Sequence, residues 1–138
     1  MSFIVEKHKN EVSHIFHCGD GCTDFDNIIK DYPTIKFTIV AGNCDFSDKH
    51  PLKAITTING KRIFSTHGHA YNAKHTLTNM YYATLEEKAD ICLFGHTNKP
   101  TNIVEGNIKM INPGSLYTSQ TYCIINFENN VNCKFYNC

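Results

Sequence analysis

The chain has 138 residues, and at that length folding buries roughly two-thirds of the surface that the unfolded chain exposes. Its 13 basic and 13 acidic residues balance and are scattered along the sequence, so nucleic acid and anionic membrane are not indicated as partners. No apolar run approaches the roughly 20 residues of a membrane span, and the N-terminus lacks the apolar middle of a secretory signal. We therefore expect a single cytoplasmic domain over residues 1–138.

The seven cysteines are an odd number, and no two of them have C-x-x-C spacing. Disulfide frameworks and structural zinc clusters need paired, closely spaced thiols, so neither is expected. Most of these cysteines are expected to act as small buried apolar residues.

Three short apolar runs, at residues 14–18, 35–41 and 91–94, predict buried parallel strands. A helix is predicted over 24–31, where an acidic residue begins the segment and Tyr32-Pro33 ends it. A second, longer helix is predicted over 72–88. Its core-facing stripe should be formed by Leu77, Met80, Tyr81 and Leu85.

Later segments favour antiparallel pairing. Residues 54–58 and 62–65 flank Asn59-Gly60, which is a strong signal for a hairpin turn. Two further hairpins are predicted, one joining 103–104 to 108–111 and one joining 122–127 to 131–136. The predicted fold class is α/β, an α+β sandwich in which mixed β-sheets are layered with flanking helices.

Four short motifs follow strand-like segments, and each combines glycine with a side chain that can bind a metal. They are His17-Cys-Gly-Asp20, Gly42-Asn-Cys-Asp45, Thr66-His-Gly-His69 and Gly95-His-Thr-Asn98. Taken singly, each is more typical of a turn or of a structural histidine. Ligands of open α/β sheets bind beyond the carboxyl ends of strands, where such loops converge. Asp20, Asn43, His67 and His96 then form a mixed oxygen and nitrogen set suited to Mn²⁺, Fe²⁺ or Zn²⁺.

The ordered series GD, GNCD, THGH, GHTN and NPGS (residues 112–115) resembles the calcineurin-like metallophosphoesterase superfamily. Within it, the chain is most similar to the small single-domain bacterial and archaeal phosphodiesterases, and the match runs from about residue 12 to the C-terminus. The resemblance implies a four-layer sandwich of mixed sheets and flanking helices. It also implies two divalent metal ions, with Mn²⁺ expected first and Zn²⁺, Fe²⁺ or Ni²⁺ as alternatives.

The resemblance assigns roles to individual residues. Asp20 matches the aspartate that bridges both metals, whereas Asn43, His67 and His96 match the other protein ligands of the second metal. Asp20, His67 and His96 are accordingly the expected catalytic residues. Cys44 stands where larger phosphatases have a catalytic histidine, a replacement that the small phosphodiesterases share. His69 matches a histidine behind the ligands, and residues 112–115 match a structural turn.

The sequence departs from the family pattern at two places. Family members begin with a strand that ends in Asp-x-His, but residues 1–13 contain no such motif, and Met1 falls where the following helix should begin. Asn98 stands where the family has the last histidine of GHTH, so we count it only as a weak ligand. The fold is therefore expected to be N-terminally shortened. A misplaced start and a genuine loss of the first metal site both explain the first departure, and Asn98 favours the second explanation.

Two classes of function follow from these observations. The first is a metal-dependent phosphodiesterase that hydrolyses a small phosphate ester with metal-activated water, at a rate reduced by the altered first-metal ligands. The alternative is a non-catalytic metal-binding or protein-interaction scaffold, as in the retromer subunit that shares this fold. A third possibility is a structural relic that binds no metal. A homo-oligomer is also expected, because a missing strand would leave a sheet edge uncovered.

Overall fold

The computed structural model describes residues 1–46 and 49–138, which form an α/β protein with mixed sheets and three α-helices. None of the helices among these residues is long and apolar enough to cross a membrane. In chain order the elements are α1 (Ser2–His8), β1 (His14–His17), α2 (Cys22–Ile29), β2 (Lys36–Ile39), β3 (Lys53–Ile58), β4 (Lys61–Thr66), the 3₁₀ helix η1 (His69–Tyr71), α3 (Thr78–Glu86), β5 (Ile91–Leu93), β6 (Thr101–Glu105), β7 (Ile108–Asn112), β8 (Thr121–Asn126) and β9 (Asn132–Asn137).

The strands form one five-stranded sheet and two strand pairs. The five-stranded sheet has the order β3-β4-β5-β7-β6, with β4, β5 and β7 parallel and the two edge strands antiparallel. β1 pairs with β2 in parallel, and β8 pairs with β9 as an antiparallel hairpin. The three predicted parallel strands and the three predicted hairpins are therefore present, and Asn59-Gly60 forms the β3–β4 turn with both residues at positive φ.

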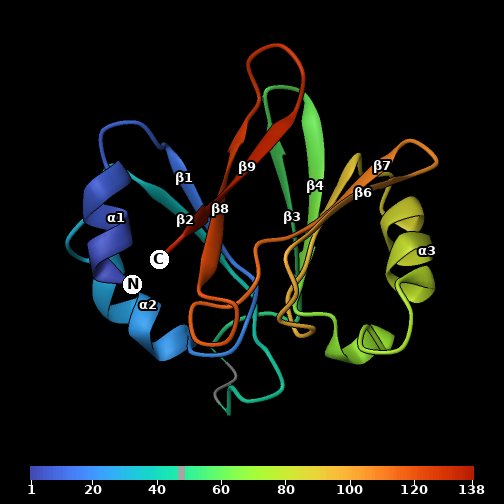
Figure 1. Cartoon of the computed structure of the whole chain (residues 1–138), viewed down its shortest axis with the longest axis horizontal. Coiled ribbons are helices and arrows are strands. Elements are labelled where there is room, and N and C mark those ends of the chain that lie inside the picture. Colours follow the sequence, from blue (N-terminus) through green and yellow to red (C-terminus); the bar gives the residue numbers. More distant parts are fainter. Residues whose placement is uncertain (47–48) are drawn as a thin grey trace.

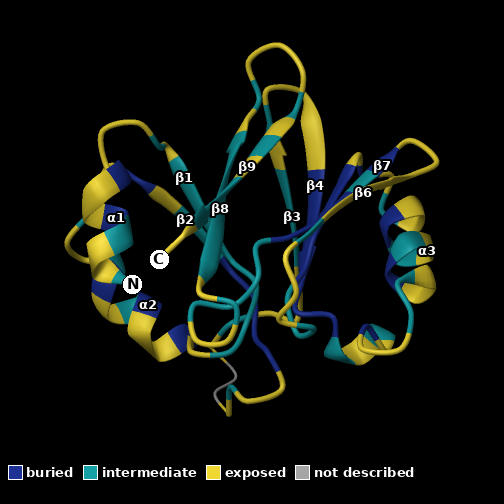
Figure 2. Cartoon of the chain, viewed as in Figure 1, coloured by how far each residue is buried: buried dark blue, intermediate teal, exposed yellow. Residues whose placement is uncertain are grey.

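The five-stranded sheet is covered on both faces (Figure 1). Alternate residues point to opposite sides: Phe64, Cys92 and Met110 pack under α3, whereas Ile63 and Ile91 face β1 and the β8–β9 hairpin. α1 and α2 pack on the β1–β2 pair through two further apolar clusters. Figure 2 shows the resulting distribution, with buried residues concentrated in the central strands and exposed residues on the outer helix faces and loop tips.

The helix predicted over residues 72–88 is shorter than expected, because α3 begins only at Thr78. Asn72 takes a left-handed conformation (φ 58°) and ends η1, so the intervening residues form turns. The predicted apolar stripe is also only partly right, since Met80 is fully buried but Leu85 is 46% exposed. Thr84 takes the buried position and donates its hydroxyl to the Met80 carbonyl, which satisfies a polar group in the core.

The cysteines divide among environments more evenly than predicted. All seven carry free thiols; Cys22 and Cys92 are buried, three are half-buried, and Cys44 and Cys138 are exposed. Their small size suits a core position, but the two exposed cysteines lie in a loop and at the C-terminus, where little packs against them.

The loops that carry the four motifs all leave the carboxyl ends of parallel strands. β1 leads to Asp20, β2 to Asn43, β4 to His67 and β5 to His96. Two different parallel units, β1–β2 and β4–β5, therefore contribute to one loop region.

Candidate metal centre

Asp20 lies in a backbone segment of unusual conformation. Gly19, Asp20 and Gly21 all have positive φ (98°, 64° and 83°), a region that most residues with a side chain avoid. Successive left-handed residues point their N–H groups into one concavity, which makes an anion-binding turn. Here the anion is a side chain of the protein itself.

The carboxylate of Asp45 fills that turn. It accepts the backbone N–H groups of Asp20 (2.7 Å), Gly21 (3.0 Å) and Cys22 (3.1 Å), and also that of Gly42 (2.8 Å). The Cys22 thiol donates a further hydrogen bond at 3.1 Å. Burial alone would raise the pKa of Asp45, but these donors outweigh it and hold the pKa well below its ordinary value. Asp45 thus joins the β1 loop to the β2 loop.

His67 is the buried centre of the site, with only 2% of its surface exposed. Its Nδ1 lies 2.7 Å from the Cys18 carbonyl oxygen. Because a carbonyl can only accept, Nδ1 carries the proton and Nε2 of the neutral ring presents a lone pair. Burial lowers the pKa of His67, which favours this neutral ring.

The other three predicted ligands meet at that lone pair. Asp20 Oδ2 lies 3.3 Å from His67 Nε2, and Asn43 Oδ1 lies 3.0 Å from it. His96 Nδ1 is 3.2 Å from the same nitrogen. The structure therefore brings together Asp20, Asn43, His67 and His96, which come from four separate loops.

These donor atoms fit a divalent cation. A carboxylate oxygen and an amide oxygen both face a nitrogen lone pair, and such electron-rich atoms repel one another unless a proton or a cation lies between them. Two ligands of one ion, each about 2.1 Å from it, are roughly 3.0–3.4 Å apart, which matches the separations seen here. Counting only histidine, cysteine, aspartate and glutamate, no group of three or more in the described parts of the chain could hold a metal ion. Asp20, His67 and His96 alone do not form such a group, and the Asn43 amide oxygen, 3.0 Å from His67 Nε2, is the fourth donor.

Glycine is required where the loops approach closely. A Cβ on Gly42 would lie 2.1 Å from Asp20 Oδ1 and 2.6 Å from the Asp20 nitrogen. A Cβ on Gly19 would lie 2.6 Å from His67 Nδ1. Real Cβ atoms do not approach other atoms so closely, so only glycine lets Asp20 and His67 occupy these positions.

The motif at residues 112–115 supports the loop that carries His96. His96 has φ of 68°, and such strained conformations gather at functional sites. The fully buried Asn112 donates its Nδ2 to the Gly95 carbonyl (3.2 Å) and to Thr97 Oγ1 (2.9 Å), on either side of His96. Asn112 Oδ1 accepts the N–H of Gly114, which has φ of 87°. These contacts give residues 112–115 a structural role.

Two other motif residues lie outside this set. Asn98 is exposed, has φ of 61°, and makes none of the contacts that join the four ligands. The His69 ring centre is 5.4 Å from that of His67 and 6.3 Å from that of His96. Its buried Nδ1 has no hydrogen-bond partner among the described residues, so His69 borders the site without completing it.

Cys44 contacts the site through its backbone, whose N–H donates to Asp20 Oδ1 at 2.9 Å. The negative charge of Asp20 raises the pKa of the Cys44 thiol. A raised pKa opposes formation of the thiolate, which is the nucleophilic form of cysteine. This environment does not favour Cys44 as a nucleophile.

Asp45 and Cys18 are the contributors that the sequence reading missed. Asp45 was part of a recognised motif, and an acid three residues after a turn glycine could have indicated a carboxylate that accepts backbone N–H groups. The carbonyl of Cys18 acts through the main chain, so no residue type could have revealed it.

Comparison with known proteins assigns the chain to a family. Residues 2–130 match the family model described as the calcineurin-like phosphoesterase superfamily domain. "Probable metallophosphoesterase YsnB" of Bacillus subtilis (strain 168) is 33% identical over 141 residues, covering 96% of this chain and 80% of the relative. A predicted phosphoesterase from Streptococcus pneumoniae TIGR4 superposes with a TM-score of 0.84 at 26% identity, covering 99% of this chain and 80% of that one.

A more distant structure shares the fold. Wild-type Vps29 of Entamoeba histolytica, solved in complex with Zn²⁺, has a TM-score of 0.74 and 16% identity, covering 97% of this chain and 87% of that one. The family match over nearly the whole chain and the 33% identical relative decide the assignment. The chain belongs to the calcineurin-like phosphoesterase superfamily.

Proposed function

We propose that this chain is a divalent-metal-dependent phosphodiesterase that hydrolyses a small phosphate ester with metal-activated water. The observation that carries the proposal is the meeting of Asp20, Asn43 and His96 at the unprotonated Nε2 of His67, at 3.0–3.3 Å. Membership of the phosphoesterase superfamily supports the reaction type. The mixed nitrogen and oxygen donors favour Mn²⁺, with Zn²⁺, Fe²⁺ and Ni²⁺ as alternatives.

A divalent ion in this position supplies Lewis acidity, which polarises a phosphoryl oxygen and makes water nucleophilic near neutral pH. The chain's own residues keep the ligands ready for it. The Cys18 carbonyl fixes the His67 tautomer, and the Asp45 carboxylate fixes the loop that carries Asp20. The Cys44 N–H fixes one oxygen of Asp20, which leaves Oδ2 directed at His67 Nε2. Such preorganisation lowers the reorganisation needed during reaction.

Hydrolysis of bis(4-nitrophenyl) phosphate with added Mn²⁺ tests this proposal. Asp20→Ala and His96→Ala should each reduce turnover to the background rate, because each removes a donor atom from the set. His75→Ala is the matched control, since His75 is an exposed turn residue outside the cluster, and it should leave turnover unchanged. Activity that survives both site substitutions would come from a contaminant and would contradict the proposal.

A non-catalytic metal-binding scaffold is the second candidate. The Zn²⁺ complex of Vps29 is a specific observation in its favour, because that protein has this fold. In that case Mn²⁺ or Zn²⁺ should raise the melting temperature of the chain without any hydrolysis. An ion present at 100 times its Kd stabilises the native state by about 2.7 kcal/mol. No shift in melting temperature would exclude both the enzyme and the metal-binding scaffold.

A further inference from the structure

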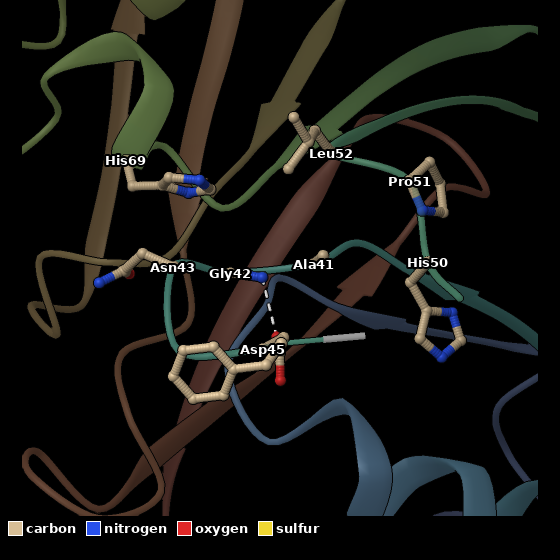
Figure 3. Close-up of a pocket in the computed structure, with 9 residues that line it drawn as sticks. Ala41, Gly42, Asn43, Asp45, His50, Pro51, Leu52 and His69 are labelled. Atoms are coloured by element: carbon tan, nitrogen blue, oxygen red, sulfur yellow. Dashed lines mark hydrogen bonds between the residues drawn. The ribbon is translucent and has the colours of Figure 1, made fainter. Parts of the chain in front are cut away.

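A pocket of about 590 Å³ opens beside the metal-ligand cluster. Asn43, one of the four ligands, forms part of its wall together with His69. Figure 3 shows His69 projecting toward the segment that carries Gly42 and Asn43, while His50 and Pro51 lie at the opposite end. A group attached to a phosphoryl centre at the cluster would therefore extend into this pocket, whose size is typical of small-molecule sites.

The rim of the pocket carries uncovered apolar side chains. Phe46 is 97% exposed, and Leu52 is 57% exposed. A phenyl ring with almost no contact in the free protein has its faces available for stacking against another flat ring. Pro51 and Ala41 add further apolar surface to the wall. The lining thus offers contacts to an organic group and not to water alone.

The lining of the pocket offers few charged groups to a ligand. None of the lysines and arginines in the described residues is among those that line it. The carboxylate of Asp45 lies in the wall, and its oxygens accept the backbone N–H groups described above. At the far end, His50 Nε2 is 2.9 Å from Asp26 Oδ1, and the Lys49 ammonium is 3.3 Å from Asp26 Oδ2. Both basic groups near that end are therefore engaged by the Asp26 carboxylate.

We propose that this pocket binds an aromatic ring in the organic part of the phosphate ester, with Phe46 stacking on that ring. The substrate class is then an aromatic phosphoester. This inference rests on the proposed function, because that function places the phosphoryl group at the cluster formed by Asp20, Asn43, His67 and His96.

Binding of two phosphonates that cannot be hydrolysed tests the subsite without requiring activity. Phenylphosphonate and methylphosphonate share a head group and differ in the ring, and their Kd values are measured by calorimetry on the Mn²⁺-loaded full chain. We expect phenylphosphonate to bind about three- to tenfold more tightly. Phe46→Ala should reduce that ratio to less than about twofold, while Phe46→Tyr retains it. Phe3→Ala is the matched control, since Phe3 is 77% exposed on α1, and it should change neither Kd.

The other possible outcomes would each contradict the aromatic subsite alone or the proposed function as well. Equal affinity for the two phosphonates in the unmodified protein would overturn the aromatic subsite but leave the proposed function intact. A preference for phenylphosphonate that survives Phe46→Ala would also overturn it, because the ring would then bind elsewhere. If neither phosphonate binds in the presence of Mn²⁺, the cluster does not receive a phosphoryl group, and the proposed function fails together with the subsite.

Discussion

Several groups in this site act by orienting neighbouring side chains. His67 presents Nε2 because the Cys18 carbonyl holds the proton on Nδ1, and Asp20 points at that nitrogen because Asp45 holds its loop. Asp45 is not one of the four candidate ligands, yet it accepts more backbone hydrogen bonds than any other carboxylate in the described chain. We therefore identify Asp45 as a positioning residue.

Asp45→Asn should weaken both the fold and metal binding. An amide replaces one acceptor oxygen with an NH₂ group, so backbone donors that Asp45 now satisfies would lose their partner. We expect unfolding to become easier by about 2–4 kcal/mol, measured by urea denaturation. The Kd for Mn²⁺, measured by calorimetry at a temperature where the variant is folded, should rise because Asp20 is no longer held.

Asp31→Asn is the control for this substitution. Asp31 is exposed just after α2, so neither stability nor the Kd for Mn²⁺ should change appreciably. An Asp45→Asn protein that loses stability but binds Mn²⁺ normally would show that Asp45 is structural only.

At the scale of elements, the site is formed by loops from two separate parallel units, β1–β2 and β4–β5. These loops approach one another so closely that their contacts leave no room for an added side chain. The β1 loop contacts the β2 loop at Gly42, and the β4 and β5 loops join through Gly95, whose N–H donates to the His67 carbonyl at 3.0 Å. The strands set the direction of each loop, and the glycines set how closely the loops approach.

Gly42→Ala should disrupt the metal site by steric conflict alone, since Gly42 does not have a positive φ. The added methyl group would lie 2.1 Å from Asp20 Oδ1, so the carboxylate or its loop must move. We expect the Kd for Mn²⁺ to rise at least about tenfold and stability to fall by about 1–3 kcal/mol. Calorimetric titration and urea denaturation measure the two effects.

Gly60→Ala is a control that distinguishes backbone strain from steric disruption of the metal site. Gly60 has φ of 80° in the β3–β4 turn, and a Cβ there would meet nothing within 4 Å. Its substitution should cost about 1 kcal/mol of stability and leave Mn²⁺ binding unchanged. Equal effects of the two substitutions on Mn²⁺ binding would rule out the steric explanation.

At the scale of the whole molecule, packing of the sheets and helices also removes from solvent much of His17, which is not part of the ligand set. His17 ends β1 and packs on the Phe25 ring of α2, with ring centres 4.3 Å apart. Burial lowers the pKa of His17 from its ordinary value of 6.5 to about 4. The folded protein therefore holds this ring neutral under conditions in which the unfolded chain would protonate it.

Stability should consequently fall as the solution becomes acidic. The folded pKa is the lower one, so the unfolded state binds more protons between pH 6.5 and 4, and the loss occurs across that window. The full contribution is about 3 kcal/mol. Calorimetric melting at pH 7 and pH 5 should show a smaller decrease for His17→Gln than for the unmodified protein. His75→Gln, at an exposed position, should retain the full decrease.

Much of the fold could be predicted because its signals are local. Asn59-Gly60 fixes the β3–β4 hairpin through backbone preference, and the run at 91–94 forms a buried strand because it has no polar face. The run at 14–18 also forms a strand, but it is only half-buried. The error at residues 72–77 arose because Asn72 adopts a left-handed conformation that helical periodicity does not register. Leu85 was misassigned because Thr84 satisfies its own hydroxyl within the helix and can be buried instead.

The sequence by itself determined which chemical groups are available: one carboxylate, one amide and two imidazoles, each placed by a glycine-containing loop after a strand. It also determined the family, because the order of the motifs is a property of the chain. Only the tertiary structure decided that these groups meet at His67 Nε2 and that Asp45 holds the loop of Asp20. The reason is physical, since the contacts join residues 24 to 49 positions apart, and only packing of the sheets sets such distances.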